Sequence, residues 1–296
     1  MEKTGDKNSK PSLGKETRDL LKESGLKARK SLGQHFLVDR RVLGKIIASG
    51  GITKEDVIIE VGPGLGVLTL ELAKLAGQVI CIEIDSSLAA NLGGRLSGID
   101  NVSILNRDVL GTRPSEVLPP GETRYKVIAN LPYYITSPVL RHFLEAEVRP
   151  CLMVVMVQKE VARSIAAIPG KMSLLSVGVQ LYGRAEIISA VPARSFHPVP
   201  KVDSAVVRVT SYPEEIIPAG CRGSFFEVVR AGFGSPRKQL INTLSHGLGM
   251  DKENVSGRML EAGIEPKRRA ESLSVEEWCC LWRVLKKDEG EGECLH

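Results

Sequence analysis

The sequence predicts an α/β domain built on a mostly parallel sheet, followed by a small helical domain. Short β-branched apolar runs begin at residues 57, 78, 102 and 126, and each interval is long enough for one helix. Another run, 152–157, is apolar at every position, as in a central strand covered on both faces. After residue 212 the strand patterns give way to helical ones. With 296 residues, 43% of them hydrophobic, the chain can bury one large core and a smaller second one.

The predicted elements alternate in the order that a parallel sheet with helical crossovers requires. A short helix is expected at residues 16–24, ending at Gly25. The strands are expected at 57–61, 78–84, 102–105, 126–129 and 152–157, with helices at 66–75, 87–96 and 137–143. Two later strands, 180–191 and 204–210, are joined by a proline-rich stretch and predict an antiparallel pair at the sheet edge.

A change of composition near residue 212 predicts a domain boundary. Pro213, Pro218 and Gly220 form the expected linker. We therefore expect a basic, partly disordered tail over residues 1–25, an α/β domain over 26–211 and a helical domain over 212–296. Within the last, helices are predicted at 225–232, 236–244, 252–262 and 275–286.

Positive charge is concentrated near the N-terminus. Residues 1–45 hold 12 Lys and Arg against six Asp and Glu, whereas the net charge of the whole chain is +5. Such a segment suggests an anionic partner such as nucleic acid, and the alternative is a solvated tail that keeps the protein in solution. No apolar run approaches the roughly 20 residues of a membrane span, and the N-terminus lacks the apolar stretch of a secretory signal. We therefore expect a cytoplasmic protein with no membrane partner.

A glycine-rich loop at residues 60–66, Glu-Val-Gly-Pro-Gly-Leu-Gly, follows one predicted strand and opens a helix. Such a loop lets the backbone turn sharply and approach a ligand closely. Glu83 ends the next strand, where a carboxylate can accept hydrogen bonds from both ribose hydroxyls. Asp108 follows the third strand, in a position to meet an adenine edge. Because an acidic residue leads the glycines, we interpret the loop as an S-adenosylmethionine site, and a purely structural turn is the alternative.

The sequence Asn130-Leu131-Pro132-Tyr133 at the end of another strand indicates methyl transfer to an exocyclic amine of adenine. The lone pair of that nitrogen is delocalised into the ring, so the site must draw it out of conjugation. The Asn130 side-chain oxygen and the carbonyl of Leu131 or Pro132 can accept the two N6 hydrogens, and Tyr133 can stack on the base. The alternative is a strand-end turn with a buried tyrosine.

A second aromatic residue, Phe196, lies on a loop stiffened by prolines and is a candidate to close the other face of a flipped base. By itself it is more typical of a core phenylalanine. The six cysteines and five histidines show no metal-ligand spacing, so we expect no metal site. Methyl transfer from a sulfonium requires none, because positioning for in-line displacement is the main contribution.

Five ordered motifs together resemble the ribosomal RNA adenine dimethyltransferases, and most closely their bacterial small-subunit branch. These motifs are residues 31–37 (SLGQHFL), 60–64 (EVGPG), 130–133 (NLPY), 158–162 (QKEVA) and 196–207 (FHPVPKVDSAVV), within a similarity that runs from about residue 20 to about 285. The resemblance implies a Rossmann-like S-adenosylmethionine-dependent methyltransferase fold with a mostly parallel seven-stranded sheet. It also implies a small all-helical C-terminal domain.

The function implied by the resemblance is dimethylation of N6 on two adjacent adenosines in the 3′-terminal hairpin loop of 16S ribosomal RNA. The resemblance implies that S-adenosylmethionine is the methyl donor and that the partner is the small ribosomal subunit during its maturation. It also implies that the protein is a monomer. The implied cofactor-binding residues are His35, Leu37, Gly62, Glu83, Asp108 and Asn130, and the implied target-base residues are Asn130, Leu131, Pro132, Tyr133 and Phe196. The N-terminal segment and the C-terminal domain, with Arg237 and Lys238, are implied to hold RNA.

Three positions depart from the family pattern. His35 stands where many members have Asn, and Pro236 replaces a frequent Arg. The loop at residues 170–173 is shorter than usual and lacks a Tyr-Gly pair. The change at His35 affects a cofactor contact that the resemblance implies, and the change at Pro236 removes an implied phosphate contact. The short loop affects the implied docking of RNA there.

Three other functions are compatible with parts of the pattern. A 23S ribosomal RNA adenine methyltransferase of the antibiotic-resistance class shares the fold and residues 130–133, but the sequence at 198–204 favours the small-subunit enzymes. A non-catalytic RNA-binding assembly factor is disfavoured because Glu83, Asp108, Asn130 and Tyr133 are all present. A small-molecule methyltransferase would show no salt-dependent binding to RNA.

Overall fold

The computed structural model describes residues 12–26, 28–29 and 32–287. Ser31 of the first motif and residues 1–11 of the predicted N-terminal tail lie outside these residues. By their internal packing, residues 1–159 and 187–208 form one compact unit, and residues 160–186 and 209–296 form a second. The helices of residues 160–180 therefore pack with the C-terminal helices. The boundary predicted near residue 212 remains a prediction.

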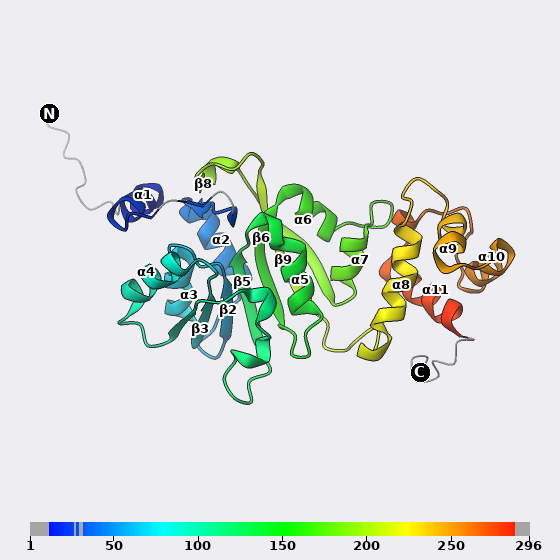
Figure 1. The fold of residues 1–296 in the computed structure, drawn as a ribbon, viewed down its shortest axis with the longest axis horizontal. Coiled ribbons are helices and arrows are strands. Elements are labelled where there is room, and N and C mark those ends of the chain that lie inside the picture. The colour runs from blue at the N-terminus through cyan, green and yellow to red at the C-terminus, as the bar shows by residue number, and fades with distance from the viewer. Residues whose placement is uncertain (1–11, 27, 30–31, 288–296) are drawn as a thin grey trace. The chain divides into compact units, whose positions relative to one another are not determined.

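A mostly parallel sheet forms the centre of the fold (Figure 1). Among the described residues its strand order is β4-β3-β2-β5-β6-β9-β7, and the pairs β4–β3, β3–β2, β2–β5 and β5–β6 are parallel. The strands are β2 (Val57–Val61), β3 (Gln78–Ile82), β4 (Val102–Leu105), β5 (Tyr125–Asn130), β6 (Leu152–Gln158), β7 (Gly183–Val191) and β9 (Ser204–Ser211). All five residues of β2 are buried, because β2 is covered on both faces. The predicted parallel α/β architecture is confirmed.

Helices follow the strands as the sequence spacing predicts. They are α3 (Val67–Leu75), α4 (Ser86–Leu96) and α5 (Thr136–Leu144), and α1 (Leu13–Glu23) precedes the sheet. A helix that the sequence analysis missed, α2 (Arg40–Gly50), packs against β5 and β6. Its signal was present, because the Asp39 side chain caps the helix at the Arg41 amide and the buried Val42 and Ile46 are four residues apart.

A short antiparallel ladder joins the N-terminal segment to the proline-rich loop. Strand β1 (Phe36–Leu37) pairs with β8 (Phe196–His197), so that Phe36 faces His197 and Leu37 faces Phe196. This ladder brings residues about 160 positions apart to the same edge of the first unit. The proline-rich stretch between the predicted strands 180–191 and 204–210 is therefore partly a strand.

The second unit is helical apart from the strand ends it contains. Its helices are α6 (Lys159–Ile165), α7 (Leu174–Gln180), α8 (Arg222–Phe233), α9 (Leu240–Leu248), α10 (Lys252–Glu261) and α11 (Val275–Lys286). The first residue of α6, Lys159, belongs to the first unit. Trp278 and Trp282 are fully buried at its centre, and a Cβ on Gly232 would lie 2.3 Å from the Trp278 ring. The short loop at 170–173 docks on the same unit, since the amides of Gly170 and Met172 donate to the Glu271 carbonyl. Helix α9 begins at Leu240, four residues later than predicted, because Gln239 has extended backbone angles.

Candidate functional site

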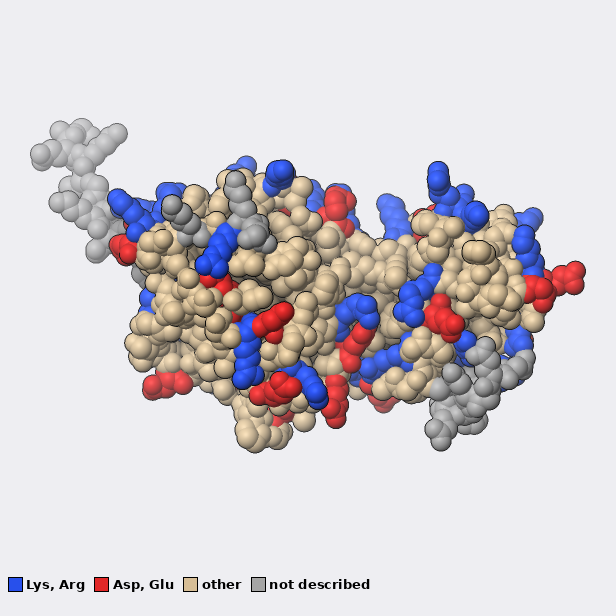
Figure 2. Space-filling view, in the orientation of Figure 1, with Lys and Arg blue, Asp and Glu red and all other residues tan. Residues whose placement is uncertain are grey.

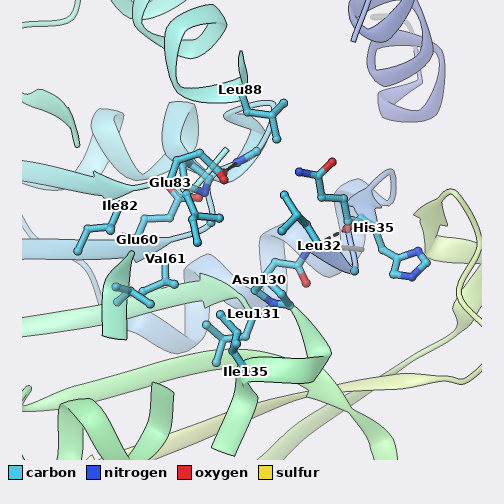
Figure 3. Close-up of a pocket in the computed structure, with 18 of the residues that line it drawn as sticks. Leu32, His35, Glu60, Val61, Ile82, Glu83, Leu88, Asn130, Leu131 and Ile135 are labelled. Atoms are coloured by element: carbon cyan, nitrogen blue, oxygen red, sulfur yellow. Dashed lines mark hydrogen bonds between the residues drawn. The ribbon is translucent and has the colours of Figure 1, made fainter. Parts of the chain in front are cut away.

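A cavity of about 350 Å³ opens where the parallel strands β2, β3 and β5 end (Figure 3). Strand β2 lies between β3 and β5, so the chain order reverses there, which is the position where α/β sheets bind ligands. Every sequence-predicted site residue except Phe196 lines this cavity: His35, Leu37, Gly62, Glu83, Asp108, Asn130, Leu131, Pro132 and Tyr133.

The glycine-rich loop has the geometry that its sequence predicts. Gly62, Gly64 and Gly66 all have positive φ angles, of 66°, 58° and 75°. A Cβ on Gly64 would lie 3.1 Å from the Phe36 ring, so there is little space for a side chain. The positive φ angle at Gly64 also favours glycine over residues with a side chain. Helix α3 begins directly after Gly66, and its first two residues, Val67 and Leu68, line the cavity.

Glu83 forms the acidic wall of the cavity. It is 4% exposed, and its carboxylate accepts hydrogen bonds from the amides of Gly64 (3.1 Å) and Asp85 (3.0 Å). Burial raises the pKa of this carboxyl, and hydrogen bonds from the amides of Asp85, Gly64 and Ile84 offset part of that effect. The carboxylate also lines the cavity, where its oxygens can accept from ribose hydroxyls. Asp108, on the next strand end, caps a short turn at the Leu110 amide (2.9 Å).

Glu60 lies deeper, beneath the glycine loop, and was not predicted as a site residue. It is 1% exposed, and burial raises its pKa to about 8. The Cys81 thiol donates to its carboxyl group at 3.7 Å, and Thr69 is a second hydrogen-bond partner. The sequence analysis used Glu60 only as the acidic residue that leads the glycines, and its contact with Cys81 follows from the pairing of the two residues across β2 and β3.

Asn130 lies at the opposite end of the cavity from the acidic wall, as Figure 3 shows. Its Nδ2 atom donates to the His35 carbonyl at 3.0 Å, which fixes the amide and leaves Oδ1 as an acceptor. The Leu131 amide donates to Met156 O, and Pro132 O already accepts from the Ile135 amide at 3.2 Å. Of the two carbonyls considered from the sequence, the Leu131 carbonyl is therefore the better candidate for a base contact.

Tyr133 is half-buried and held at both ends of its side chain. Its hydroxyl is hydrogen-bonded to Ser204 Oγ at 2.7 Å, and its ring stacks on His35 with centroids 5.7 Å apart and planes inclined by 26°. Burial raises the pKa of the Tyr133 hydroxyl. Tyr134, the next residue, is 54% exposed at the mouth of the same cavity.

The structure does not bring Phe196 to the cavity. This residue is 1% exposed and packs in the core with Leu37, Val191 and Val206. The β1–β8 ladder turns its side chain into that core, which sequence reasoning could not foresee from a proline-rich loop. Stacking of Phe196 on a base requires a movement of β8 and remains a prediction.

The N-terminal segment is tied to the cofactor end of the cavity by contacts that the sequence analysis did not identify. Arg29 forms an ion pair with Asp85 (3.3 Å), and Gln34 Nε2 donates to the same carboxylate (3.1 Å). Asp85 in turn caps helix α4 at the Ser87 amide. Some of the positive charges of residues 1–45 therefore form ion pairs within the protein. Arg40, which pairs with Glu16, is a second example.

Within residues 12–26, 28–29 and 32–287, no group of three or more His, Cys, Asp or Glu side chains could hold a metal ion. The same part of the chain contains no helix long and apolar enough to cross a membrane.

Comparisons with protein families and with known proteins all find ribosomal RNA methyltransferases. Residues 25–287 match the family described as ribosomal RNA adenine dimethylase. The chain is 49% identical over 279 residues to the ribosomal RNA small subunit methyltransferase A of Dehalococcoides mccartyi, covering 94% of this chain and 95% of that protein. It is 41% identical over 281 residues to the protein of the same name from Enterococcus faecalis, covering 92% and 95%.

Two solved structures are similar over most of their length. A dimethyladenosine transferase from Plasmodium falciparum has 25% identity and a TM-score of 0.71, covering 86% of this chain and 98% of that chain. The 23S rRNA methyltransferase ErmE has 29% identity and a TM-score of 0.69, covering 85% and 99%.

Proposed function

Because this chain belongs to the ribosomal RNA adenine dimethylase family, we propose that it dimethylates N6 of two adjacent adenosines in small-subunit (16S) ribosomal RNA. The methyl donor is S-adenosylmethionine, and the target adenosines lie in the 3′-terminal hairpin loop of an RNA in a maturing small subunit. The observation that carries the proposal is the position of residues 130–133 at a strand end, facing the acidic wall across one cavity.

The cavity fits the proposed cofactor. Glu83 presents a buried carboxylate where the ribose would lie, and the glycine loop leaves a cradle that a Cβ at Gly64 would fill. When bound, S-adenosylmethionine supplies a methyl group on a positively charged sulfur. Gly62, Glu83 and Asp108 would hold its adenosyl end, and the main chain of His35 and Leu37 would cover it.

The base end of the cavity fits an adenine amine. Asn130 Oδ1 and the Leu131 carbonyl would accept the two N6 hydrogens and so turn the lone pair away from the ring. The Asn130 amide cannot reverse its orientation without losing its hydrogen bond to His35 O. Tyr133 would stack on the base, and stacking of this kind contributes roughly 1–3 kcal/mol per base. Catalysis then rests on orientation of the two reactants, in which the N6 lone pair forms the new C–N bond as the C–S bond breaks. The methylated nitrogen releases its extra proton to water.

RNA contacts are proposed on both units. Arg237 and Lys238 are exposed in the turn between α8 and α9, and Figure 2 shows Lys and Arg side chains over the helical unit with acidic ones among them. In the first unit, Lys15, Arg18 and Lys22 lie on helix α1. Lys3, Lys7, Lys10, Lys27 and Lys30 lie outside the described residues. We further propose that the protein acts as a monomer in the cytoplasm.

The test is methylation of unmethylated small ribosomal subunits with labelled S-adenosylmethionine, with large-subunit RNA as the parallel substrate. We expect label in N6,N6-dimethyladenosine from small subunits alone. Label from large-subunit RNA would instead place the chain with the resistance methyltransferases. Absence of label from both, with binding of cofactor and RNA retained, would identify a non-catalytic assembly factor.

A further inference from the structure

His35 contacts three parts of the base-binding end of the cavity at once. We propose, building on the function above, that the His35 side chain is a positioning residue for the target adenine. Its ring holds Tyr133 at the stacking position, and its Nδ1 atom holds the proline-rich loop beside it. The resemblance to the family assigns this position to cofactor binding, whereas its side chain points away from Glu83 in Figure 3.

The contacts of His35 carry this inference. The imidazole is stacked on Tyr133 with ring centroids 5.7 Å apart, and its Nδ1 lies 2.7 Å from Pro198 O. Its main-chain carbonyl accepts the hydrogen bond from Asn130 Nδ2 at 3.0 Å. One residue therefore connects the amide and the aromatic ring that would hold the base to the loop that follows β8.

The Pro198 contact also fixes the ring. A carbonyl only accepts, so Nδ1 must carry a proton, and in the neutral imidazole Nε2 is the bare nitrogen. With Nδ1 bonded to Pro198 O, the ring cannot flip without losing the bond. Tyr133 is thus restrained twice, by His35 on its face and by Ser204 at its hydroxyl.

Histidine is required for both contacts together. An asparagine, which many family members have here, offers an N–H donor for the Pro198 carbonyl but no ring for Tyr133. A phenylalanine offers the ring but no donor. The two contacts can therefore be removed separately at one position.

The experiment compares His35→Asn and His35→Phe in the full chain, using unmethylated small subunits and S-adenosylmethionine. Aromatic pairing of this kind corresponds to about a 2- to 12-fold effect. We expect His35→Asn to lower kcat/KM for subunits by that factor, while the Kd for S-adenosylmethionine stays within about twofold. His35→Phe should retain more activity than His35→Asn, because it keeps the ring on Tyr133.

His142 provides the matched control. Its Nε2 also contacts a main-chain carbonyl, Thr112 O at 2.9 Å, and its ring also packs on an aromatic residue, Phe143, but it does not line the cavity. His142→Asn should leave kcat/KM for subunits unchanged. The inference is overturned if the His35 variants match this control, or if their loss is explained by a weakened Kd for the cofactor.

A second measurement keeps the test decisive if His35→Asn lowers stability. Ser204→Ala removes the other restraint on Tyr133, so its effect on kcat/KM should be non-additive with that of His35→Asn. Strict additivity would contradict action through Tyr133. Activity of the wild-type protein separates the two proposals: if wild type methylates no adenosine the proposed function fails, and if only the variant pattern is absent this inference alone fails.

Discussion

The Cys81 thiol donates a hydrogen bond to the Glu60 carboxyl group, 3.7 Å away, across the register pair that joins β3 to β2. Both side chains are almost fully buried beneath the glycine-rich loop. Burial raises the pKa of Glu60 to about 8 and that of Cys81 well above its usual value. Glu60 is therefore mainly protonated at neutral pH, and the floor of the cofactor cavity is uncharged.

This burial makes stability depend on pH. A carboxyl whose pKa is raised on folding, here from 4.5 to about 8, binds more protons in the folded state between those values. The contribution of Glu60 to stability then falls as pH rises through that window and levels off above pH 8. We expect Glu60→Gln to flatten the decline of Tm between pH 5 and 8, measured by thermal unfolding. The exposed Glu55→Gln should keep the wild-type slope, and an unchanged slope in Glu60→Gln would contradict the buried, protonated state.

Asn130→Ala should abolish most methyl transfer while cofactor and RNA still bind. The variant loses the acceptor proposed for one N6 hydrogen, and removal of one such polar contact from a transition state costs about 100- to 1,000-fold in kcat. Single-turnover methylation of small subunits, with Kd values for both ligands, is the measurement. Wild-type turnover in this variant would remove Asn130 from the catalytic assignment.

Tyr133 and Phe196 should respond differently to truncation. Tyr133→Ala should weaken base capture by about 1–3 kcal/mol, seen as a loss of kcat/KM for subunits. Phe196 lies in the core, so Phe196→Ala should instead cost about 3–5 kcal/mol in unfolding free energy. Phe196→Leu, which keeps most of the volume, separates the two effects. Loss of activity in Phe196→Leu without loss of stability would show that the ring does reach the base.

The sequence predicted those features that depend on local spacing, and it failed where distant segments meet. The strand at 57–61 is where the apolar run predicted it, because a parallel strand buried on both faces needs a mainly apolar sequence. The strand at 102–105 also lies where it was predicted, although its residues are only half-buried at the edge of the sheet. Gly62, Glu83, Asp108 and residues 130–133 were found because each lies at or just after a strand end, whereas His35 and Leu37 were found only through the resemblance to the family. The burial of Phe196 depends instead on pairing with Leu37, which no local pattern encodes. The grouping of α6 and α7 with the C-terminal helices likewise depends on long-range contacts such as Gly170 to Glu271.

Gly64→Ala should weaken cofactor binding. The φ angle of 58° costs an L-residue about 1–2 kcal/mol, and the new Cβ would press on Phe36 at 3.1 Å. We expect a higher Kd for S-adenosylmethionine by calorimetry and a lower Tm. Gly93→Ala is the matched control, because Gly93 lies inside helix α4 with open space around its Cβ position. That substitution should leave the Kd unchanged and raise stability by up to about 1 kcal/mol.

Arg237→Ala and Lys238→Ala should each reduce the salt dependence of RNA binding. Both side chains are exposed in the turn between α8 and α9, and each phosphate contact contributes about one unit to the slope of log K against log salt concentration. Binding of small-subunit RNA should be measured between roughly 50 and 200 mM salt. Lys74→Ala, in which the lost lysine pairs with Glu71 at 2.7 Å, should keep the wild-type slope. If all three variants share that slope, the turn between α8 and α9 makes no phosphate contact, and the RNA must be held by other basic residues, such as those on α1.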